Sequence, residues 1–281
     1  MNRPIRLGVF GAGQVYRQLY APALAVRPEF RVVGSADPVA PARFRRPEDL
    51  LAAAEVDGVI VLSPPALHAE HVGLALARGV RVLVEKPPAT TIAGVDGWAN
   101  PELVACAFSR RYWKPYRNPM RGARHFVYEL QTNPATWGAR AAEPVERDLL
   151  PHAADLAGWL SGSAIADIQS VSRGPSSASG TFLLENGGRF EWRVAHRESF
   201  SESLTCDGTA VPAAIPGPVG EALRRLRRAP TAAVAGLSAL LADWAASFEG
   251  PGPATLPGIE AARSCARVIE TVERVASSPS P

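Results

Sequence analysis

Short apolar runs that alternate with helical patterns are the feature that most constrains the fold of this chain. In the first 120 residues, runs such as IRLGVF, GVIVL and VRVLV alternate with helical patterns such as PEDLLAAA and HAEHVGLALARG. Continuous apolar runs of this kind indicate parallel strands buried on both faces, because the helices that connect them cover the sheet. We therefore predict an α/β domain with a doubly wound parallel sheet over residues 1–120.

The pattern changes at about residue 121, and residues 121–281 are predicted to form a smaller α+β domain. RHFVYEL indicates a lone strand, and RDLLPHAADLAGWLSG indicates a helix that ends at Gly162. Four strand-like runs then follow back to back, with an ENGG hairpin turn between two of them, so we expect an open antiparallel sheet. The four runs are IADIQSVSR, SASGTFLLE, GRFEWRVAH and SFSESLTCD. Two helical patterns close the chain.

Composition and charge exclude several kinds of partner. The formal net charge is only +3, and the one dense basic cluster, RRLRR at 224–228, lies on a helical pattern with a leucine stripe. Such a cluster is more typical of a solvated helix face than of a nucleic-acid site. The apolar runs are too short to span a membrane, and the first strand begins too early to leave room for a signal peptide. We expect a cytoplasmic protein with no nucleic-acid or membrane partner.

The three cysteines do not suggest a disulfide framework. Cys106, Cys206 and Cys265 are far apart, odd in number and in apolar contexts. Such a set fits reduced thiols in a core better than a metal site or disulfides. We therefore predict no metal ligands.

A glycine turn at the end of the first strand indicates a dinucleotide site. In GAGQVY, Gly11 can make the tight bend and Gly13 can let a pyrophosphate approach the backbone. Gln14 and Val15 follow in the same turn, so we include them among the candidate cofactor-binding residues. Tyr16 stands where this Rossmann motif normally has a small residue, and an ordinary glycine turn is the alternative.

Asp37 follows the second strand and is the candidate ligand of the cofactor ribose. A carboxylate there accepts hydrogen bonds from ribose hydroxyls and repels a 2′-phosphate, so NAD is predicted in preference to NADP. Arg43 lies close behind and can serve a phosphate, which leaves NADP open. The alternative for Asp37 is a turn residue before Pro38.

Lys86 is one of only two lysines among 30 basic residues; the other is Lys114. Because this chain otherwise uses arginine, a lysine is most easily explained where a proton must be released, which guanidinium cannot do. Lys86 is therefore a candidate for proton transfer. Chance in an arginine-rich chain is the alternative.

Several motifs together resemble the glucose-fructose oxidoreductase and inositol dehydrogenase family (Gfo/Idh/MocA). They are GAGQVY, SADP, VIVLSPPALHAEHVGLALARGVRVLVEKP, AFSRRY and DLLPHAADLAGWLSG. The resemblance places Lys86, in the Glu85-Lys86-Pro87 turn, beside the nicotinamide and the substrate, and implies a cis Lys-Pro bond. It also implies that Ser63, Pro64 and His68, from the turn before the third helical pattern, lie on the cofactor side with Glu85.

A second match lies in DLLPHAAD. Asp148, His152 and Asp155 are spaced i, i+4 and i+7, so a continuous helix would present them on one face. The resemblance gives catalytic roles to Asp148 and His152 and places Asp155 toward the substrate. The alternatives are that Asp148 is a helix N-cap and that His152 is a core histidine.

The resemblance implies an NAD(P)-dependent dehydrogenase or reductase. We expect hydride transfer between the nicotinamide and a hydroxyl or carbonyl carbon of a small polar substrate such as a sugar or cyclitol. Arg111 and Tyr112 are candidate substrate residues, with interdomain packing as the alternative. An imine reductase and a non-catalytic nucleotide-binding regulator remain open as functions.

Assembly is also predicted. The runs FLLE and FEWRV are expected to place apolar and aromatic side chains on the open face of the second sheet, and large apolar faces seldom stay bare. Together with the resemblance, this predicts a homodimer or homotetramer formed through the C-terminal sheet.

Overall fold

A computed structural model describes residues 3–136, 143–213, 215, 217–227 and 229–277. Contacts divide the chain into two units, Met1–Ser109 with Ala233–Ala266 and Arg110–Ala232 with Arg267–Pro281. A late segment of the chain thus groups with the first unit. The predicted domain limits at residues 120 and 121 stay a prediction.

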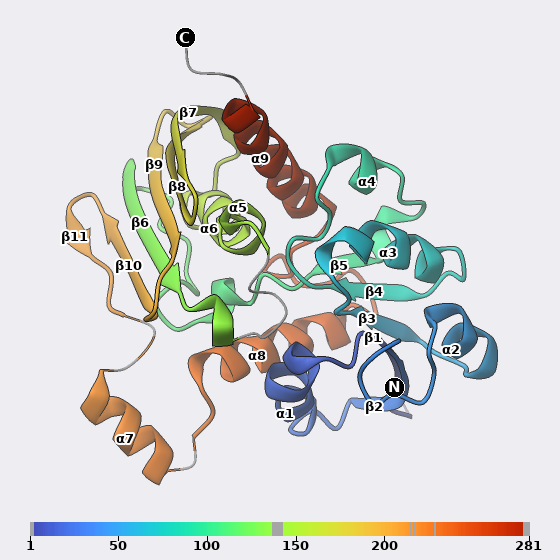
Figure 1. The fold of residues 1–281 in the computed structure, drawn as a ribbon. Helices are drawn as coiled ribbons and strands as arrows, with labels where there is room; N and C mark the ends of the chain where they lie inside the picture. Colours follow the sequence, from blue (N-terminus) through green and yellow to red (C-terminus); the bar gives the residue numbers. More distant parts are fainter. Residues whose placement is uncertain (1–2, 137–142, 214, 216, 228, 278–281) are drawn as a thin grey trace. The chain divides into compact units, whose positions relative to one another are not determined.

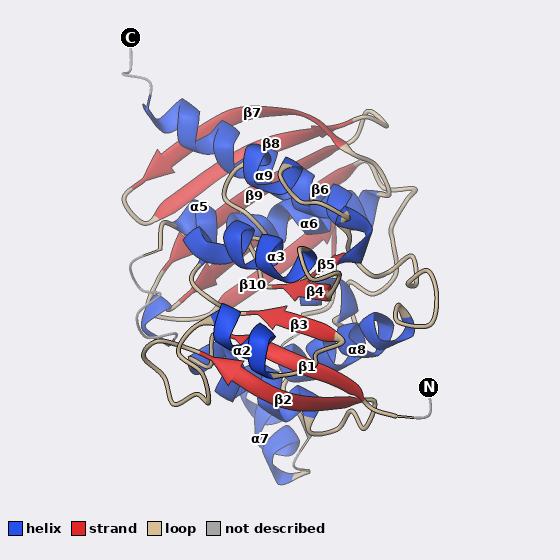
Figure 2. Cartoon of the chain, turned by 90° about the vertical axis from the view of Figure 1, so that its right-hand side faces the viewer, coloured by secondary structure: helices blue, strands red, loops and turns tan. Residues whose placement is uncertain are grey.

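The first unit contains the predicted doubly wound parallel sheet (Figures 1 and 2). Its strands lie in the order β2-β1-β3-β4-β5, and every pairing is parallel. The chain moves from β1 to β2 on one side and then to β3 on the other, so the order reverses between β1 and β3. The bounds are β1 Ile5–Phe10, β2 Phe30–Ala36, β3 Gly58–Val61, β4 Arg81–Val84 and β5 Val104–Cys106.

Short helices connect these strands, and one late helix completes the unit. In α8 (Ala232–Ala246), Trp244 stacks on Phe30 of β2 with ring centroids 5.5 Å apart, and Phe248 lies against Trp244. A methyl group on Gly58 of β3 would lie 2.8 Å from the Phe248 ring. These close contacts explain why α8 groups with the first unit. The other helices are η1 Tyr16–Tyr20, α1 Ala21–Leu24, α2 Pro47–Ala53, η2 Pro65–Leu67, α3 His68–Leu76, α4 Ile92–Asp96 and η3 Pro101–Leu103.

The second unit is built on a mostly antiparallel sheet in the order β11-β10-β6-β9-β8-β7. The strand expected to stand alone, β6, lies inside this sheet, antiparallel to β10 and parallel to β9. The four predicted runs are its other long strands. The bounds are β6 His125–Thr132, β7 Ile165–Gly174, β8 Ser177–Leu184, β9 Arg189–His196, β10 Ser201–Cys206 and β11 Thr209–Ala210.

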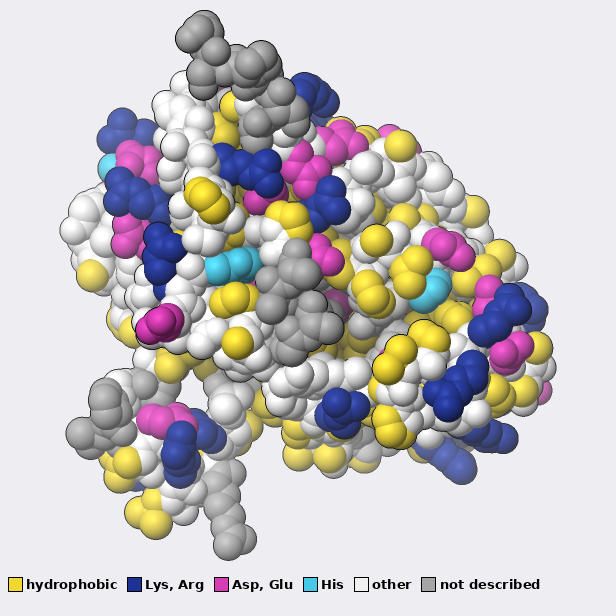
Figure 3. Space-filling view, in the orientation of Figure 1, with side chains coloured by type: hydrophobic (Ala, Val, Ile, Leu, Met, Phe, Trp, Pro, Cys, Tyr) yellow, Lys and Arg dark blue, Asp and Glu magenta, His cyan; other side chains and the backbone are white. Residues whose placement is uncertain are grey.

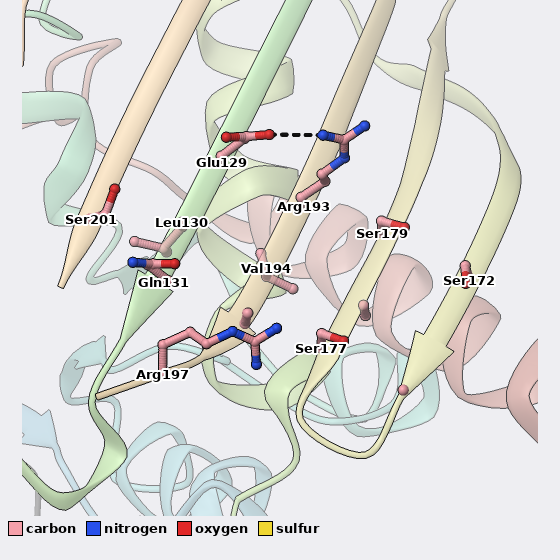
Figure 4. A pocket seen from close by; sticks show the side chains of 13 residues that line it. Glu129, Leu130, Gln131, Ser172, Ser177, Ser179, Arg193, Val194, Arg197 and Ser201 are labelled. Atoms are coloured by element: carbon pink, nitrogen blue, oxygen red, sulfur yellow. Dashed lines mark hydrogen bonds and ion pairs between the residues drawn. The ribbon is translucent and has the colours of Figure 1, made fainter. Parts of the chain in front are cut away.

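The two faces of this sheet differ sharply in chemistry. Phe182, Phe190 and Trp192 are at most 1% exposed and stack on one another on the covered face. The opposite face is polar, and Figure 4 shows Glu129 and Arg193 paired across it at 3.0 Å. The expectation that FLLE and FEWRV place aromatic residues on the open face is therefore wrong, because the alternation along β8 and β9 directs those rings into the core.

Helices complete the second unit. The helix α5 (Val145–Asp148) packs on the sheet at β8 and β9, and α6 (Leu150–Ser161) packs at β7 and β9. The helix α6 ends at Gly162, which has φ 64° as a left-handed cap. The helix α7 (Pro218–Leu226) carries both hydrophobic and basic side chains (Figure 3), and its Leu226 is 80% exposed. The second unit begins within the 3-10 turn η4 (Ser109–Tyr112). The helix α9 (Ile259–Ser277) begins in the first unit and ends in the second. Among the helices described, none is both long and apolar enough to cross a membrane.

Candidate active site

In the first unit the strand order reverses between β1 and β3, so the carboxyl ends of these two strands mark a reversal point. Gly11 has φ +99°, and a Cβ atom there would lie 2.7 Å from the backbone of Leu62. Only glycine fits this position without moving the end of β3. Open α/β sheets bind their ligands at such a reversal point.

Gly13 lies two residues further on, beside open space. A Cβ atom built on it meets nothing within 4 Å, so its backbone is accessible to a ligand. Gln14 and Val15 begin the helix that follows, and Val15 is 7% exposed, so its side chain packs inward. The sequence then takes a π-helical form over Tyr16–Tyr20, and burial raises the pKa of Tyr16. The loop and the open backbone fit the pyrophosphate of a dinucleotide.

Asp37 is held by backbone donors at the end of β2. Its Oδ2 accepts from Ala12 N at 2.8 Å, and its Oδ1 accepts from Val39 N at 2.8 Å and Ala40 N at 2.7 Å. Burial acts to raise the pKa of Asp37, but these hydrogen bonds, with Arg17 nearby, outweigh burial and hold the pKa below its ordinary value. Asp37 therefore stays ionised and ties the glycine turn to β2. A carboxylate has about four acceptor positions, so a ribose hydroxyl still finds one.

Buried polar side chains gather at the carboxyl ends of β3 and β4. Within residues 3–109 they are Ser63, His68 and Glu85. The His68 ring lies 2.7 Å from the carbonyl oxygens of both Ser63 and Pro87. Glu85 accepts hydrogen bonds from the Tyr20 hydroxyl at 3.0 Å and from the backbone N–H of Lys86 at 2.9 Å.

Lys86 follows directly after this buried glutamate, and the Lys86-Pro87 bond is cis, as the resemblance implied. Pro64 begins the turn that leads into α3. Ser63 also contacts His71, whose Nδ1 lies 2.9 Å from the Ser63 hydroxyl. The first unit thus brings the candidates at the ends of β3 and β4 together, whereas Lys86 lies in a different unit from Asp148 and His152.

In the second unit the predicted helix is interrupted. Asp148 ends α5, Leu149 forms the joint, and His152 and Asp155 belong to α6. Pro151 explains the break, because it has no N–H to continue the ladder of helical hydrogen bonds. The N-cap of α6 is Leu149 and no side chain caps it, so the interpretation of Asp148 as an N-cap is wrong.

Asp148 instead pairs with a histidine that the sequence interpretation missed. His196, at the end of β9, places Nε2 3.2 Å from Asp148 Oδ2, and the side chains are 11% and 13% exposed. His152 is 8% exposed in the same unit. No local spacing signals His196, because its link to Asp148 depends on how α5 lies on the sheet.

The candidate substrate residues Arg111 and Asp155 form a buried ion pair. Arg111 Nε lies 2.9 Å from each carboxylate oxygen, and the guanidinium lies 5.2 Å from the Trp159 ring centroid. Burial raises the pKa of Asp155, and Arg111 acts against this rise. Tyr112 follows in the same turn. The pair therefore joins the turn η4 to α6.

A second buried pair anchors the same turn. Arg110 Nε donates to Glu202 Oε1 of β10 at 2.9 Å, and the Tyr128 hydroxyl donates to the same oxygen at 2.7 Å. Burial raises the pKa of Tyr128, and the Glu202 carboxylate adds to this rise. Arg110 and Arg111 thus fix η4 between the sheet and α6.

Comparison with known proteins supports the interpretation of the first unit. The model of the Gfo/Idh/MocA oxidoreductase family, described as an NAD-binding Rossmann fold, matches residues 5–100. This segment is similar to the members of that family. The match covers the glycine turn, Asp37 and the Glu85-Lys86-Pro87 turn.

Curated relatives match over the same part of the chain. Galactose 1-dehydrogenase of Pseudomonas fluorescens is 34% identical over 112 residues, which are 38% of this chain and 37% of the relative. Inositol 2-dehydrogenase of Acidiphilium cryptum is 34% identical over 146 residues, which are 47% of this chain and 40% of the relative. The matches thus span well under two thirds of these relatives' lengths.

Solved structures extend the likeness of fold beyond the Gfo/Idh/MocA segment. A myo-inositol dehydrogenase from Corynebacterium glutamicum has a TM-score of 0.71 at 18% identity, covering 99% of this chain and 100% of that chain. A scyllo-inositol dehydrogenase from Lactobacillus casei, solved with NAD(H) and scyllo-inositol, has a TM-score of 0.75 at 14% identity, covering 97% and 96%. At these identities the likeness establishes the fold alone.

Proposed function

We propose that this protein is an NAD(P)-dependent oxidoreductase. It would transfer a hydride between the nicotinamide and a hydroxyl or carbonyl carbon of a small polar substrate of the sugar or cyclitol class. The observation that carries the proposal is Lys86 in a cis-proline turn at the carboxyl end of β4, in the same sheet edge as the open Gly13 backbone. The names of the relatives, which are dehydrogenases of a sugar and of inositols, support the substrate class.

The carboxyl ends of β1 to β4 offer a dinucleotide several groups to bind. Gly11 and Gly13 would take the pyrophosphate at the helix N-terminus, and Asp37 would take the ribose. The turn with Ser63 and Pro64 would form the wall toward the nicotinamide. When bound, the cofactor supplies or accepts the hydride, and the chain supplies the orientation and the proton.

Lys86 and His152 are the proposed proton carriers. A histidine needs little perturbation to exchange a proton near neutral pH, and a lysine can do so where an arginine cannot. Asp148 would bind a substrate hydroxyl through its carboxylate, next to the contact with His196. The His196 N–H fixes the direction of that carboxylate.

The proposed substrate region includes Arg111, Asp155 and Tyr112. Because Asp155 already accepts two charge-assisted hydrogen bonds, it is better suited to hold Arg111 in place than to bind substrate itself. Arg111 and Tyr112 would then present donors to a polyhydroxylated substrate.

The proposed setting is a cytoplasmic homodimer or homotetramer. The open face of the second sheet is the proposed interface, and its alternating Glu129, Arg193, Gln131 and Arg197 side chains offer hydrogen bonds and ion pairs to a second copy (Figure 4). The two buried cysteines, Cys106 and Cys265, fit a reducing compartment.

A binding and turnover screen tests the function. NADH and NADPH are titrated by calorimetry, and then polyols, keto-sugars and cyclic imines are offered with the cofactor in each redox state. We expect binding of NADH and turnover of at least one polyol or keto-sugar. Turnover of cyclic imines alone would favour an imine reductase, and binding without turnover would favour a regulator.

A further inference from the structure

His68 lies between two groups that can only accept hydrogen bonds. Its Nδ1 is 2.7 Å from the Pro87 carbonyl oxygen, and its Nε2 is 2.7 Å from the Ser63 carbonyl oxygen. A carbonyl oxygen has no proton to donate, and a neutral imidazole carries only one N–H. Both short contacts are hydrogen bonds only if both ring nitrogens carry a proton.

We infer that His68 is a buried imidazolium cation and a positioning residue for the turn that carries Lys86. Only the purpose of this positioning, which is to place Lys86 for proton transfer, rests on the proposed function. The charge itself follows from the two carbonyl contacts. A neutral ring would leave one nitrogen lone pair facing an oxygen lone pair at 2.7 Å, which is repulsive.

The surroundings compensate the charge. His68 is 0% exposed, and a buried charge is tolerated where dipoles and a counter-charge face it. Two carbonyl dipoles do so directly. The turn after β4 adds the buried carboxylate of Glu85, which offsets the charge, and the ammonium of Lys86, which opposes it; α3 itself carries Glu70 and His71. The loop after β3 brings no titratable group.

The two hydrogen bonds join the loop after β3 to the turn after β4. Pro87 is the neighbour of Lys86, and Glu85 binds the Lys86 backbone N–H from the other side. The backbone of Lys86 is therefore fixed at both ends. A glutamine at position 68 carries both of its N–H donors on one nitrogen and has an acceptor oxygen on the other side of the amide, so it can satisfy only one of the two carbonyls.

The charge is tested by nitrogen NMR on the whole chain labelled in histidine. The chain has five histidines, and single His→Gln variants assign their signals. We expect both ring nitrogens of His68 to give the shifts and couplings of a protonated ring at about pH 7, where an ordinary histidine is mostly neutral. A His68 signal with one bare nitrogen at that pH would overturn the inference.

The positioning is tested through the lysines. A sample labelled in lysine gives two side-chain signals, from Lys86 and Lys114. We expect His68→Gln, or His68→Asn if the first variant does not fold, to shift the Lys86 signal and leave Lys114 in place. The matched control His125→Gln, in the second sheet, should shift neither. An unmoved Lys86 signal in a folded variant would refute the positioning role. Neither experiment needs cofactor or substrate, so failure here is distinct from failure of the proposed function.

Discussion

At the residue scale, Asp37 is the proposed determinant of cofactor choice. Because its carboxylate is ionised and one acceptor position remains for a ribose hydroxyl, we expect NADH to bind at least as tightly as NADPH. Asp37→Ala should weaken NADH binding roughly 10-fold and NADPH binding less, because a hydrogen bond to a charged group is lost and a repulsion is relieved. Calorimetric titration measures both affinities. Asp49→Ala, at an exposed site, is the control, and a clear NADPH preference of the unmodified protein would contradict the assignment.

A second residue-scale prediction concerns stability against acid. Asp57 accepts hydrogen bonds from Arg3 and then Arg6, which hold its pKa well below the ordinary value. A lowered folded-state pKa contributes stability above the unfolded value of about 4, and that contribution is lost as the pH falls through the folded value. Asp57→Asn should therefore lower the Tm at neutral pH, with a deficit that shrinks below about pH 4. Thermal melts at several pH values measure the Tm difference between the variant and the unmodified protein, with Asp49→Asn as the control. A Tm difference that does not change with pH would contradict this mechanism.

The sequence predicted the positions of the candidate residues relative to strands and helices better in the first unit than in the second. Gly11, Asp37 and Lys86 stand at the ends of strands, where local pattern and strand order are enough to place them. His196 was missed because its partner Asp148 is 48 residues away and belongs to a different element. No periodicity within either segment encodes such a pairing.

At the element scale, α5 is a short helix held by two long-range ion pairs and one long-range hydrogen bond. Glu146 contacts Arg173 of β7, Arg147 contacts Glu273 of α9 at 2.6 Å, and Asp148 contacts His196 of β9. A helix of this length has little stability of its own, so these contacts fix where Asp148 points. The break after α5 was not predicted, because the apolar pattern runs on through Leu149 and Leu150 and hides the effect of Pro151.

The contact with His196 gives an element-scale prediction. His196→Ala removes the donor to Asp148 and should lower kcat/KM roughly 10-fold, mainly through a higher substrate KM, because the carboxylate loses its orientation. His196→Gln keeps an N–H donor near the position of Nε2 and should recover most of the loss. Steady-state kinetics of both variants, with His125→Ala as the control, make the comparison. Equal activity of the Ala and Gln variants would show that the hydrogen bond has no such role.

At the scale of the whole molecule, the open sheet face sets the expected mode of assembly. Its side chains are charged and polar, so an interface between copies should depend on ion pairs and weaken with salt. Sedimentation should show a dimer or tetramer, and Arg193→Glu should shift it toward monomer by placing like charges beside Glu129. Arg225→Glu on α7 is the control. A monomer at all concentrations would contradict the prediction.

The fold class was predictable from the alternation of apolar runs and helical patterns, and both sheets formed where expected. The grouping of Ala233–Ala266 with the first unit was not predictable. It depends on Trp244 and Phe248, which pack against Phe30 and Gly58, and Trp244 is over two hundred residues from Phe30 in the sequence. The faces of the second sheet were assigned wrongly for a related reason. Alternation separates two sets of side chains, but the covering helices decide which set is buried.

The most direct test of the account is the turnover of Lys86→Arg on the substrate that the screen identifies. Arginine keeps the charge but cannot release a proton, so turnover should fall roughly 100-fold or more, the usual scale for a general acid or base. Cofactor affinity should change little, because Gly11, Gly13 and Asp37 lie at the other end of the dinucleotide site. Lys114→Arg is the matched control and should keep its activity. Near-normal turnover of the Lys86→Arg variant would contradict a proton-transfer role for Lys86.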